Sequence, residues 1–289
     1  MPQTLVLGST GEDVILLQST LNSRPPTALP LLLVDGYFGP VTQERVVEFQ
    51  RNNGLLVDGV VGPITWNKLL EEKPIKGYWD KTWSRSNPFP KDSTLGIAFS
   101  GWAAPDKALS ESAKIKEELV GDKYISLGGG ESEGDTDGKF DNSKIERIIA
   151  AIKNSEFSGY KGIAFDIEKC DTGLAQKFHE AFVTAKNNNL QVLVTVSHTA
   201  PYGAADAKDL MTAFFVDENI DYLSPQLYTN GEENQNDFTE IMEVKWTDYV
   251  GAKAAIVPSI VRANLYNDAR VHFLSLGINT KGFIQWANN

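Results

Sequence analysis

Apolar residues follow two different spacings along the chain. In the first 70 residues they recur three and four positions apart, which is the spacing of helices that bury one face. Further along, short runs rich in β-branched and aromatic residues alternate with helical patterns. A polar, proline-containing stretch at 71–77 separates the two regions. We therefore expect two domains, residues 1–73 and residues 75–289.

An internal repeat organises the first region. The pattern Val-Asp-Gly-x-x-Gly-Pro-x-Thr occurs at 34–42 and again at 57–65. Asp-Gly favours a tight turn, and proline fits the first turn of a helix, where its missing N–H is harmless. Each copy thus predicts a turn followed by a helix, and a further helix is expected around Leu17. The first region is therefore expected to be a small all-α module of three helices.

Eight runs in the second region predict β-strands, at 75–79, 95–99, 124–128, 162–168, 192–197, 222–228, 254–261 and 282–286. Helical patterns separate most of them, at 109–120, 144–153, 174–187, 207–215 and 237–250. The crossover at 82–93 is the exception, because it holds two prolines and little helical periodicity. Eight strands connected by helices indicate an α/β fold, the (β/α)8 TIM barrel, whose functional residues gather at the C-terminal ends of the strands.

Charge and cysteine content narrow the range of partners. The chain carries 27 basic and 38 acidic residues, a net charge of −11, and it has no basic stripe. Nucleic acids and anionic membranes are therefore not expected as partners. A single cysteine, Cys170, excludes an intrachain disulfide and a multi-cysteine zinc site. The first residues lack the charged and apolar segments of a secretory signal.

The segment 131–141 is an acidic loop in which Glu133, Asp135 and Asp137 partly match a calcium-binding pattern. Lys144 stands where such a pattern needs a bidentate carboxylate, so a solvated loop is the favoured interpretation. We therefore expect no metal ion. We also expect no cofactor and a monomeric chain.

The fourth predicted strand carries the main candidate chemistry. It is apolar until its C-terminal end, where Asp166 and Glu168 stand two positions apart. Residues two apart on a strand face the same side, so both carboxyl groups would enter the barrel mouth about 6–7 Å apart. Carboxyl groups this close cannot both ionise freely, and one acquires a raised pKa that suits a general acid. The alternative is a solvated acidic strand end that caps a neighbouring helix or pairs with Lys169.

Other strand ends add polar and aromatic groups. The third run ends in Ser126-Leu-Gly-Gly-Gly130, whose glycines would let a ligand approach the backbone. The sixth run presents Gln226 and Tyr228 on one face, while the first and the last end in Tyr78-Trp79 and Gln285-Trp286. Each aromatic residue alone more often serves packing. Together at one end of a barrel they suit a sugar, which offers apolar ring faces and many hydroxyls.

A series of motifs covers residues 5–70. It consists of Gly8-Ser-Thr-Gly-Glu-Asp-Val14, Leu17-Gln18, Asp35-Gly36, Phe38-Gly39, Phe49-Gln50, Gly54-Leu55, Asp58-Gly59, Gly62-Pro63 and Thr65-Trp66. This series resembles the peptidoglycan-binding module found on bacterial cell-wall hydrolases. The resemblance implies binding to the wall without indicating which side chains contact glycan or peptide.

The strand-end motifs of the second region also resemble a known set. Gly162-Ile-Ala-Phe-Asp-Ile-Glu168, Ser126-Leu-Gly-Gly129, Gln226-Leu-Tyr228 and Tyr78-Trp79 are similar to motifs of family 18 glycoside hydrolases, nearest to hevamine-like class III chitinases. The resemblance implies that Glu168 is the general acid, that Asp166 stabilises the 2-acetamido group of the substrate, and that Tyr228 holds its carbonyl. It further implies substrate contacts at Gln226, Trp286, Tyr78, Ser126, Gly128 and Gly129. In such a mechanism the acetamide of the sugar is the nucleophile.

The fourth-strand motif departs from that family at two positions. Lys161 and Ala164 stand where the family usually has acids. Ala164 lies two residues before Asp166 on the same face, so the carboxyl group that usually shares a proton with Asp166 is missing. We therefore expect an enzyme with reduced activity, and a sugar-binding relative without activity is the main alternative.

Three functions fit these observations. The first is a glycoside hydrolase of the cell wall or another extracellular glycan, which cleaves β-1,4 bonds next to N-acetylglucosamine. Its substrate would be chitin, which the barrel motifs favour, or peptidoglycan, which the first module favours and which would make it an N-acetylglucosaminidase. The second is a non-catalytic chitinase-like lectin. The third is an attachment protein of an assembly or a spore coat, and turnover of N-acetylglucosamine oligomers separates the first function from the others.

Overall fold

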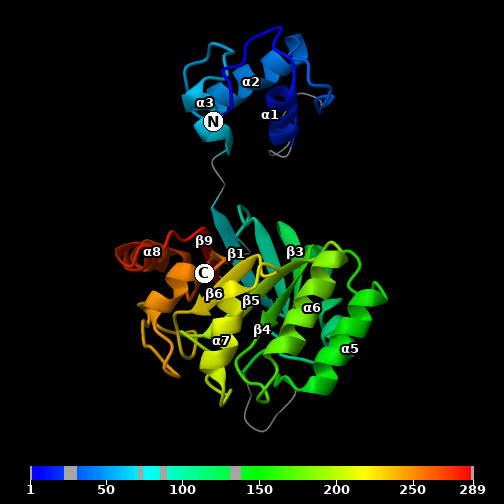
Figure 1. Ribbon diagram of the computed structural model, residues 1–289, viewed down its shortest axis with the longest axis vertical. Coiled ribbons are helices and arrows are strands. Elements are labelled where there is room, and N and C mark those ends of the chain that lie inside the picture. The colour runs from blue at the N-terminus through cyan, green and yellow to red at the C-terminus, as the bar shows by residue number, and fades with distance from the viewer. Residues whose placement is uncertain (1, 23–30, 71–73, 85–89, 131–137, 288–289) are drawn as a thin grey trace. The chain divides into compact units, whose positions relative to one another are not determined.

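The computed structural model describes residues 2–22, 31–70, 74–84, 90–130 and 138–287 (Figure 1). The chain divides into two compact units, Met1–Lys73 and Pro74–Asn289. Each unit has its own hydrophobic core. The second unit begins its first strand at Ile75, so the stretch expected as a linker, 71–77, is shorter than the composition suggests.

The N-terminal unit contains the helices that the repeat predicts. They are α1 (Glu12–Asn22), α2 (Pro40–Asn52) and α3 (Pro63–Leu70). Helices α2 and α3 both begin at the proline of a repeat copy, because proline at the first helical position loses no hydrogen bond. One side of each helix is buried in a shared core with Phe38 and Trp66.

Two buried glutamines explain why the repeat has its sequence. The Gln50 amide nitrogen donates to Asp58 Oδ1 at 2.9 Å, and its oxygen accepts from the Gly59 backbone N–H at 2.9 Å. Gln18 holds the first copy in the same way, since its amide nitrogen donates to Asp35 Oδ1 at 2.8 Å. Each glutamine thus satisfies a turn whose backbone groups would otherwise be buried without partners.

Replacing Gln50 with leucine should lower the free energy of unfolding of the N-terminal unit by about 1–3 kcal/mol, because the turn around Gly59 loses its buried partner. Hydrogen exchange of the amides in α1 to α3 of the full chain measures this effect. Glu44→Leu, at an exposed position on the same helix, is the control and should change the unfolding free energy by no more than about 0.5 kcal/mol. Equal losses in both variants would contradict the anchoring role of Gln50.

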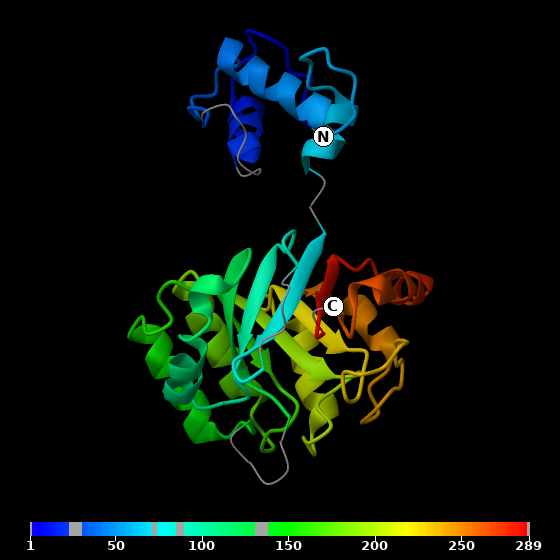
Figure 2. The ribbon, with the colours of Figure 1, turned by 180° about the vertical axis from the view of Figure 1, so that it is seen from behind.

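The second unit is a closed barrel of parallel strands surrounded by helices (Figure 1). Its strands are β1 (Ile75–Lys81), β2 (Leu95–Phe99), β3 (Asp122–Gly128), β4 (Gly162–Asp166), β5 (Gln191–Ser197), β6 (Tyr222–Gln226), β7 (Ala255–Ile256), β8 (Ser259–Ile260) and β9 (Gly282–Gln285). They follow the chain order around the barrel, and the pairing of β1 with β9 closes it. Figure 2 shows cyan β1 beside red β9. The predicted TIM barrel, preceded by a small helical module, is confirmed.

One barrel strand consists of two short segments, β7 and β8, which both pair with β6. Pro258 lies between them and has no N–H to donate to the neighbouring strand. Its carbonyl still accepts from the Ile284 amide at 3.0 Å, so the barrel stays closed on that side. The single strand expected at 254–261 is therefore interrupted without being lost.

Five α-helices in the described part of the second unit cover the barrel. They are α4 (Pro105–Ser112), α5 (Asn142–Lys153), α6 (Ala175–Asn187), α7 (Ala207–Val216) and α8 (Tyr266–Ser275), and short 3-10 helices occur at Lys116–Glu118, Trp246–Gly251 and Ala263–Leu265. The helices expected at 144–153, 174–187 and 207–215 are confirmed by α5, α6 and α7. The helix expected at 109–120 is largely wrong, because α4 already ends at Ser112.

The helix expected at 237–250 is also wrong. Asp237 Oδ1 accepts hydrogen bonds from the backbone N–H and the hydroxyl of Thr239, which stabilises a local turn in place of a helix. Met242 and Glu243 then adopt positive φ angles of 53° and 58°, which a right-handed helix excludes. Only the end of the segment is helical, as the 3-10 helix Trp246–Gly251.

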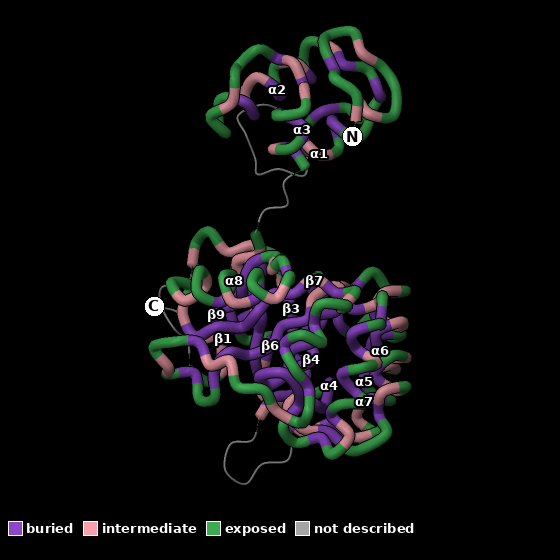
Figure 3. Tube along the Cα trace, turned by 60° about the vertical axis from the view of Figure 1, so that its left-hand side comes forward, coloured by how far each residue is buried: buried purple, intermediate pink, exposed green. Residues whose placement is uncertain are grey.

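Along each strand, successive residues point alternately to the inside and to the outside of the barrel. Trp79, Ile97, Tyr124 and Ala164 share an inner cluster, whereas Ile125 and Phe165 on the same strands pack against the covering helices. Figure 3 shows the barrel strands as buried, while exposed residues follow the outer sides of the helices. The inner positions at the C-terminal strand ends are therefore the ones that can line a site.

Candidate active site

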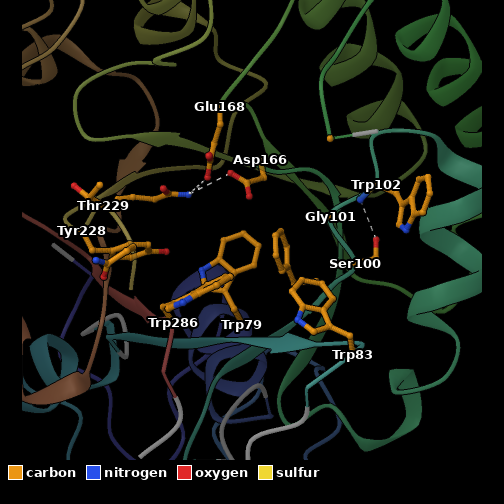
Figure 4. Close-up of a pocket in the computed structure, with 15 residues that line it drawn as sticks. Trp79, Trp83, Ser100, Gly101, Trp102, Asp166, Glu168, Tyr228, Thr229 and Trp286 are labelled. Carbon is orange, nitrogen blue, oxygen red and sulfur yellow. Dashed lines mark hydrogen bonds between the residues drawn. The ribbon is translucent and has the colours of Figure 1, made fainter. Parts of the chain in front are cut away.

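A cavity of about 530 Å³ opens at the C-terminal ends of the strands. It is lined by Trp79, Trp83, Phe99, Ser100, Gly101, Trp102, Gly130, Gly138, Asp166, Glu168, Gln226, Tyr228, Thr229, Asn230 and Trp286. These residues come from β1, β2, β4 and β6 and from the segments that follow β1, β2, β3, β4, β6 and β9. Figure 4 shows the carboxyl groups of Asp166 and Glu168 on one side of the cavity and the rings of several tryptophans on the other.

The amide of Gln226 joins the two carboxyl groups. Its Nε2 donates to Glu168 Oε1 at 3.0 Å and to Asp166 Oδ1 at 3.3 Å (Figure 4). Asp166 is the last residue of β4 and Gln226 the last residue of β6, so two rigid strands set this geometry. Glu168 lies two residues beyond the end of β4. The observed strand is thus shorter than the predicted one, which extended to residue 168.

Burial controls the ionisation of this pair. Burial raises the pKa of the Asp166 carboxyl well above its ordinary value, and the charge of Glu168 raises it further. Burial also raises the pKa of Glu168, but the hydrogen bond from Gln226 and the charges of Lys169 and His198 oppose that rise. The pair therefore retains a proton at a higher pH than two isolated carboxyl groups would.

Aromatic rings form the opposite wall. Trp286 stacks on Tyr228 with ring centroids 6.1 Å apart, and its edge contact with Phe99 has a centroid distance of 5.3 Å. The ring centroids of Trp79 and Trp286 are 6.4 Å apart. Trp83 packs against Phe99 and is exposed to solvent, so it forms the outer end of the aromatic group. Facing carboxyl groups and aromatic rings give the cavity the two surfaces that a sugar ring needs.

The Tyr228 hydroxyl is buried in this cavity and makes no hydrogen bond of normal geometry with the described residues. Burial raises the pKa of Tyr228 well above its ordinary value, and the charges of Asp166 and Glu168 raise it further. The hydroxyl therefore keeps its proton and can donate it to an acceptor on a ligand.

The structure brings together five of the predicted site residues, and they line the cavity. They are Asp166, Glu168, Gln226, Tyr228 and Trp286. Of the glycine run that follows β3, Gly130 lines the cavity, while the predicted Gly128 and Gly129 are buried behind it.

Two predicted contacts need correction. Tyr78 faces the outside of the barrel, where it packs with Ala98 and Ile115 and its hydroxyl accepts from the Val120 amide at 2.8 Å. Its neighbour Trp79 takes the inner position, because successive strand residues alternate between faces. A substrate contact at Tyr78 is therefore wrong.

Ser126 faces inward but is fully buried below the cavity and does not line it. Its hydroxyl has no hydrogen-bond partner among the described residues. Ser126 lies opposite Ala164 in the register of β3 and β4. Ser126 therefore does not contact a ligand in this cavity directly.

Sequence reasoning missed several lining residues. Phe99 ends β2 with the inward parity of Leu95 and Ile97, so the alternation of that strand could have identified it. Trp83 and Trp102 stand in the segments that follow β1 and β2, where strand periodicity no longer gives an orientation. Thr229 and Asn230 follow β6 in the same way.

The calcium pattern at Glu133, Asp135 and Asp137 lies outside the described residues. Among the residues that the structure describes, no group of three or more histidine, cysteine or acidic residues is placed to hold a metal ion. No described helix has the length and apolar character that crossing a membrane requires.

Residues 10–69 match the family model of the putative peptidoglycan binding domain. The N-terminal unit therefore carries a domain of this family, as the resemblance of its motifs implies. No curated protein matches the chain.

Several solved structures are similar to part of the chain. An endolysin of the Burkholderia phage AP3 is 38% identical over 24% of this chain and 25% of its own, with a TM-score of 0.22. The N-terminal domain of SleB is 38% identical over 25% of this chain and 93% of its own, also with a TM-score of 0.22. The spore cortex-lytic enzyme SleL of Bacillus megaterium QM B1551 is 13% identical over 64% of this chain and 50% of its own, with a TM-score of 0.38.

Proposed function

We propose that the barrel is a glycoside hydrolase of the family 18 type, which hydrolyses β-1,4 bonds next to N-acetylglucosamine in a cell-wall glycan. The observation that carries this proposal is the pair of the buried Asp166 and the half-buried Glu168, joined by Gln226 and facing the aromatic wall around Trp286. The N-terminal peptidoglycan-binding domain supports a wall glycan as the partner. The similarity of the strand motifs to chitinases supports the bond type.

In the proposed reaction, Glu168 donates its proton to the glycosidic oxygen and the bond from C1 to that oxygen breaks. The carbonyl oxygen of the 2-acetamido group attacks C1 and forms an oxazolinium ion, whose positive charge Asp166 stabilises. The Glu168 carboxylate then removes a proton from a water molecule that attacks C1. This step opens the oxazolinium ring, releases the sugar and restores protonated Glu168.

The remaining cavity residues position the substrate. The Tyr228 hydroxyl is a donor for the acetamido carbonyl, and the Trp286 ring offers an apolar floor for the sugar. Gln226 keeps the two carboxyl groups in place.

Release of reducing ends from N-acetylglucosamine oligomers and from purified peptidoglycan tests the proposal. The full chain should cleave at least one of them, and the better substrate identifies the glycan. The absence of turnover on both, at enzyme concentrations that bind them, would replace the hydrolase by the second candidate function.

That second candidate is a non-catalytic lectin, and Ala164 is the observation that favours it. Ala164 is fully buried on the inner face of β4, two residues before Asp166, where the resembling enzymes have an acid. Without that acid, β4 offers Asp166 no carboxyl group with which to share a proton, and Glu168, beyond the end of the strand, is the neighbouring acid.

Ala164→Asp should raise kcat/KM on acetylated oligomers by about three- to tenfold and shift its pH profile, because a second buried carboxyl can exchange a proton with Asp166. The unpartnered Ser126 hydroxyl opposite position 164 supplies a donor for the new group, which reduces the cost of burying it. Rates measured against pH, together with melting temperatures, test this prediction.

Ala164→Asn is the matched control, since it adds a side chain of the same size without the acid, and it should give no increase. If the folded Ala164→Asp variant is no faster at any pH, the missing acid does not limit the rate.

The hydrogen bond from Gln226 predicts a pH effect. Activity requires protonated Glu168, so kcat/KM falls as the pH rises through the pKa of Glu168. The Gln226 N–H stabilises ionised Glu168 and lowers that pKa, so Gln226→Leu should move the alkaline fall of activity to higher pH. Thr229→Val, which alters the cavity lining without touching either carboxyl group, should leave the position of this fall unchanged; a shift to lower pH in Gln226→Leu would contradict the argument.

A further inference from the structure

A lysine stands at the end of the first barrel strand. Lys81 is the last residue of β1 and lies two positions beyond Trp79, whose ring lines the cavity. Side chains two positions apart on a strand point to the same face, so Lys81 is directed inward at the C-terminal end of the barrel. Its partner in the register of β1 and β2 is Phe99, which also lines the cavity.

The Lys81 ammonium lies against the aromatic wall. Its nitrogen is 4.2 Å from the centroid of the Trp286 ring, which attracts it in a cation–π contact. Lys81 does not itself line the cavity, so it adjoins the site through Trp286. A group that reaches the ammonium must therefore project beyond the sugar that lies on the Trp286 ring.

The charge of Lys81 has no counter-ion within the described residues. Lys76, the other lysine on the same strand, pairs with Asp92, whereas Lys81 forms no ion pair with any described acidic side chain. Lys81 is half-buried, and burial lowers the pKa of its ammonium. A partly desolvated cation gains more from an anion than a fully exposed one does.

The acids of the site do not supply that anion. Asp166 and Glu168 stand on the opposite side of the cavity from Trp286 (Figure 4). The cavity thus has carboxyl groups on one side and an unpaired ammonium beside the aromatic rings of the other. A negative charge on the substrate is therefore favoured at the aromatic side and disfavoured beside the carboxyl groups.

Wall glycans differ in whether they carry such a charge. Chitin consists of N-acetylglucosamine and has no ionised group. Peptidoglycan alternates this sugar with N-acetylmuramic acid, whose lactyl ether on O3 ends in a carboxyl group. That carboxyl group is either free or linked to a stem peptide, which has carboxyl groups of its own. Only peptidoglycan therefore offers Lys81 an anionic partner that projects from a sugar ring.

We propose that Lys81 is an anion-binding residue of the cleft, which pairs with a carboxylate carried by a muramic unit next to the reacting sugar and so selects peptidoglycan over chitin. This inference rests on the proposed hydrolase function and deepens it, because it assigns the class of substrate from the barrel itself. Lys81 acts in binding, and the proton for the reaction still comes from Glu168.

The test compares kcat/KM of the full-length chain on a charged and a neutral substrate. The neutral one is an N-acetylglucosamine oligomer, and the charged one is a peptidoglycan strand freed of its peptides, so that its lactyl carboxylates are exposed. The wild type should prefer the charged strand. In Lys81→Met the ratio of charged to neutral kcat/KM should fall about tenfold, the loss expected for one hydrogen bond between charged groups. Lys81→Arg keeps the charge and should hold the ratio within about threefold of the wild type.

Two comparisons complete the test. Lys253→Met makes the same change in net charge at an exposed position before β7, at the other end of the barrel, and should leave the ratio unchanged. Strands that retain their stem peptides identify the source of the anion. A Lys81→Met defect confined to peptide-free strands assigns the pairing to the lactyl carboxylate, and one confined to peptide-bearing strands assigns it to the peptide.

Loss of the contact with Trp286 alone would slow both substrates equally and leave the ratio unchanged. An unchanged ratio in Lys81→Met on both kinds of strand, or a wild type that cleaves only the neutral oligomer, would overturn the anion-binding role while leaving the hydrolase function intact. A wild-type chain that cleaves none of the substrates would overturn the hydrolase function, and the role of Lys81 would fall with it.

Discussion

Glu168→Gln is expected to reduce kcat on acetylated glycan oligomers by a factor of about 10²–10⁴, because glutamine cannot protonate the leaving oxygen. The substitution keeps the size of the side chain and an oxygen that accepts from Gln226, so the fold and the affinity for the oligomer should be retained. Steady-state rates and the binding affinity of the same variant measure the two quantities separately. A variant that retains wild-type kcat would remove Glu168 from the reaction.

The leaving group provides an internal control for this prediction. A glycosyl fluoride needs little proton donation, so the Glu168→Gln defect should shrink on the fluoride by at least about tenfold relative to the oligomer. An equal defect on both substrates would mean that Glu168 serves binding or folding in place of acid catalysis.

Asp166→Asn is expected to lower kcat/KM by about 10²–10³, because the neutral amide no longer stabilises the positive charge that develops on the acetamido group. Asp166 is buried at the end of β4 and accepts from Gln226, so the charge that it carries when ionised acts in a medium that screens little. The rates of the variant and its melting temperature, compared with those of the wild type, test this expectation.

The two carboxyl variants should differ in their response to the leaving group. The Asp166→Asn defect concerns attack by the acetamide, a step that the fluoride also needs, so it should be equally large on both substrates. If the fluoride rescued Asp166→Asn as it rescues Glu168→Gln, the two residues would share one role, and the division of labour proposed for them would be wrong.

Much of the barrel could be predicted from the sequence because its strands are continuous apolar runs. Parallel strands buried on both faces produce such runs, and Gly162–Asp166 is one of them. The errors occur where local polar contacts or backbone strain override helical patterns. The segment from Asp237 to Val250 has helical spacing, but the Asp237 side chain stabilises a turn and Met242 adopts a positive φ.

Residues of the candidate site could be predicted from the sequence only where a strand determines the direction of the side chain. Because side chains alternate between the two faces of a strand, Asp166 and Gln226 are correctly predicted to point into the barrel. For the first strand, the same alternation shows which residues point inward only when one inward residue is already known. The choice of Tyr78 over Trp79 was wrong for that reason. Trp83 and Trp102 could not be placed at all, because they stand beyond the ends of β1 and β2, where strand alternation gives no direction.

The most direct test of the proposed chemistry is proton NMR of the first product that the full-length chain forms from N-acetylglucosamine oligomers, with Glu168→Gln as the blank. Attack by the acetamide followed by attack of water inverts C1 twice, so the new reducing end should appear first as the β-anomer and only later equilibrate with the α-anomer. A product that appears first as the α-anomer, or equal product formation by Glu168→Gln, would contradict the proposed mechanism.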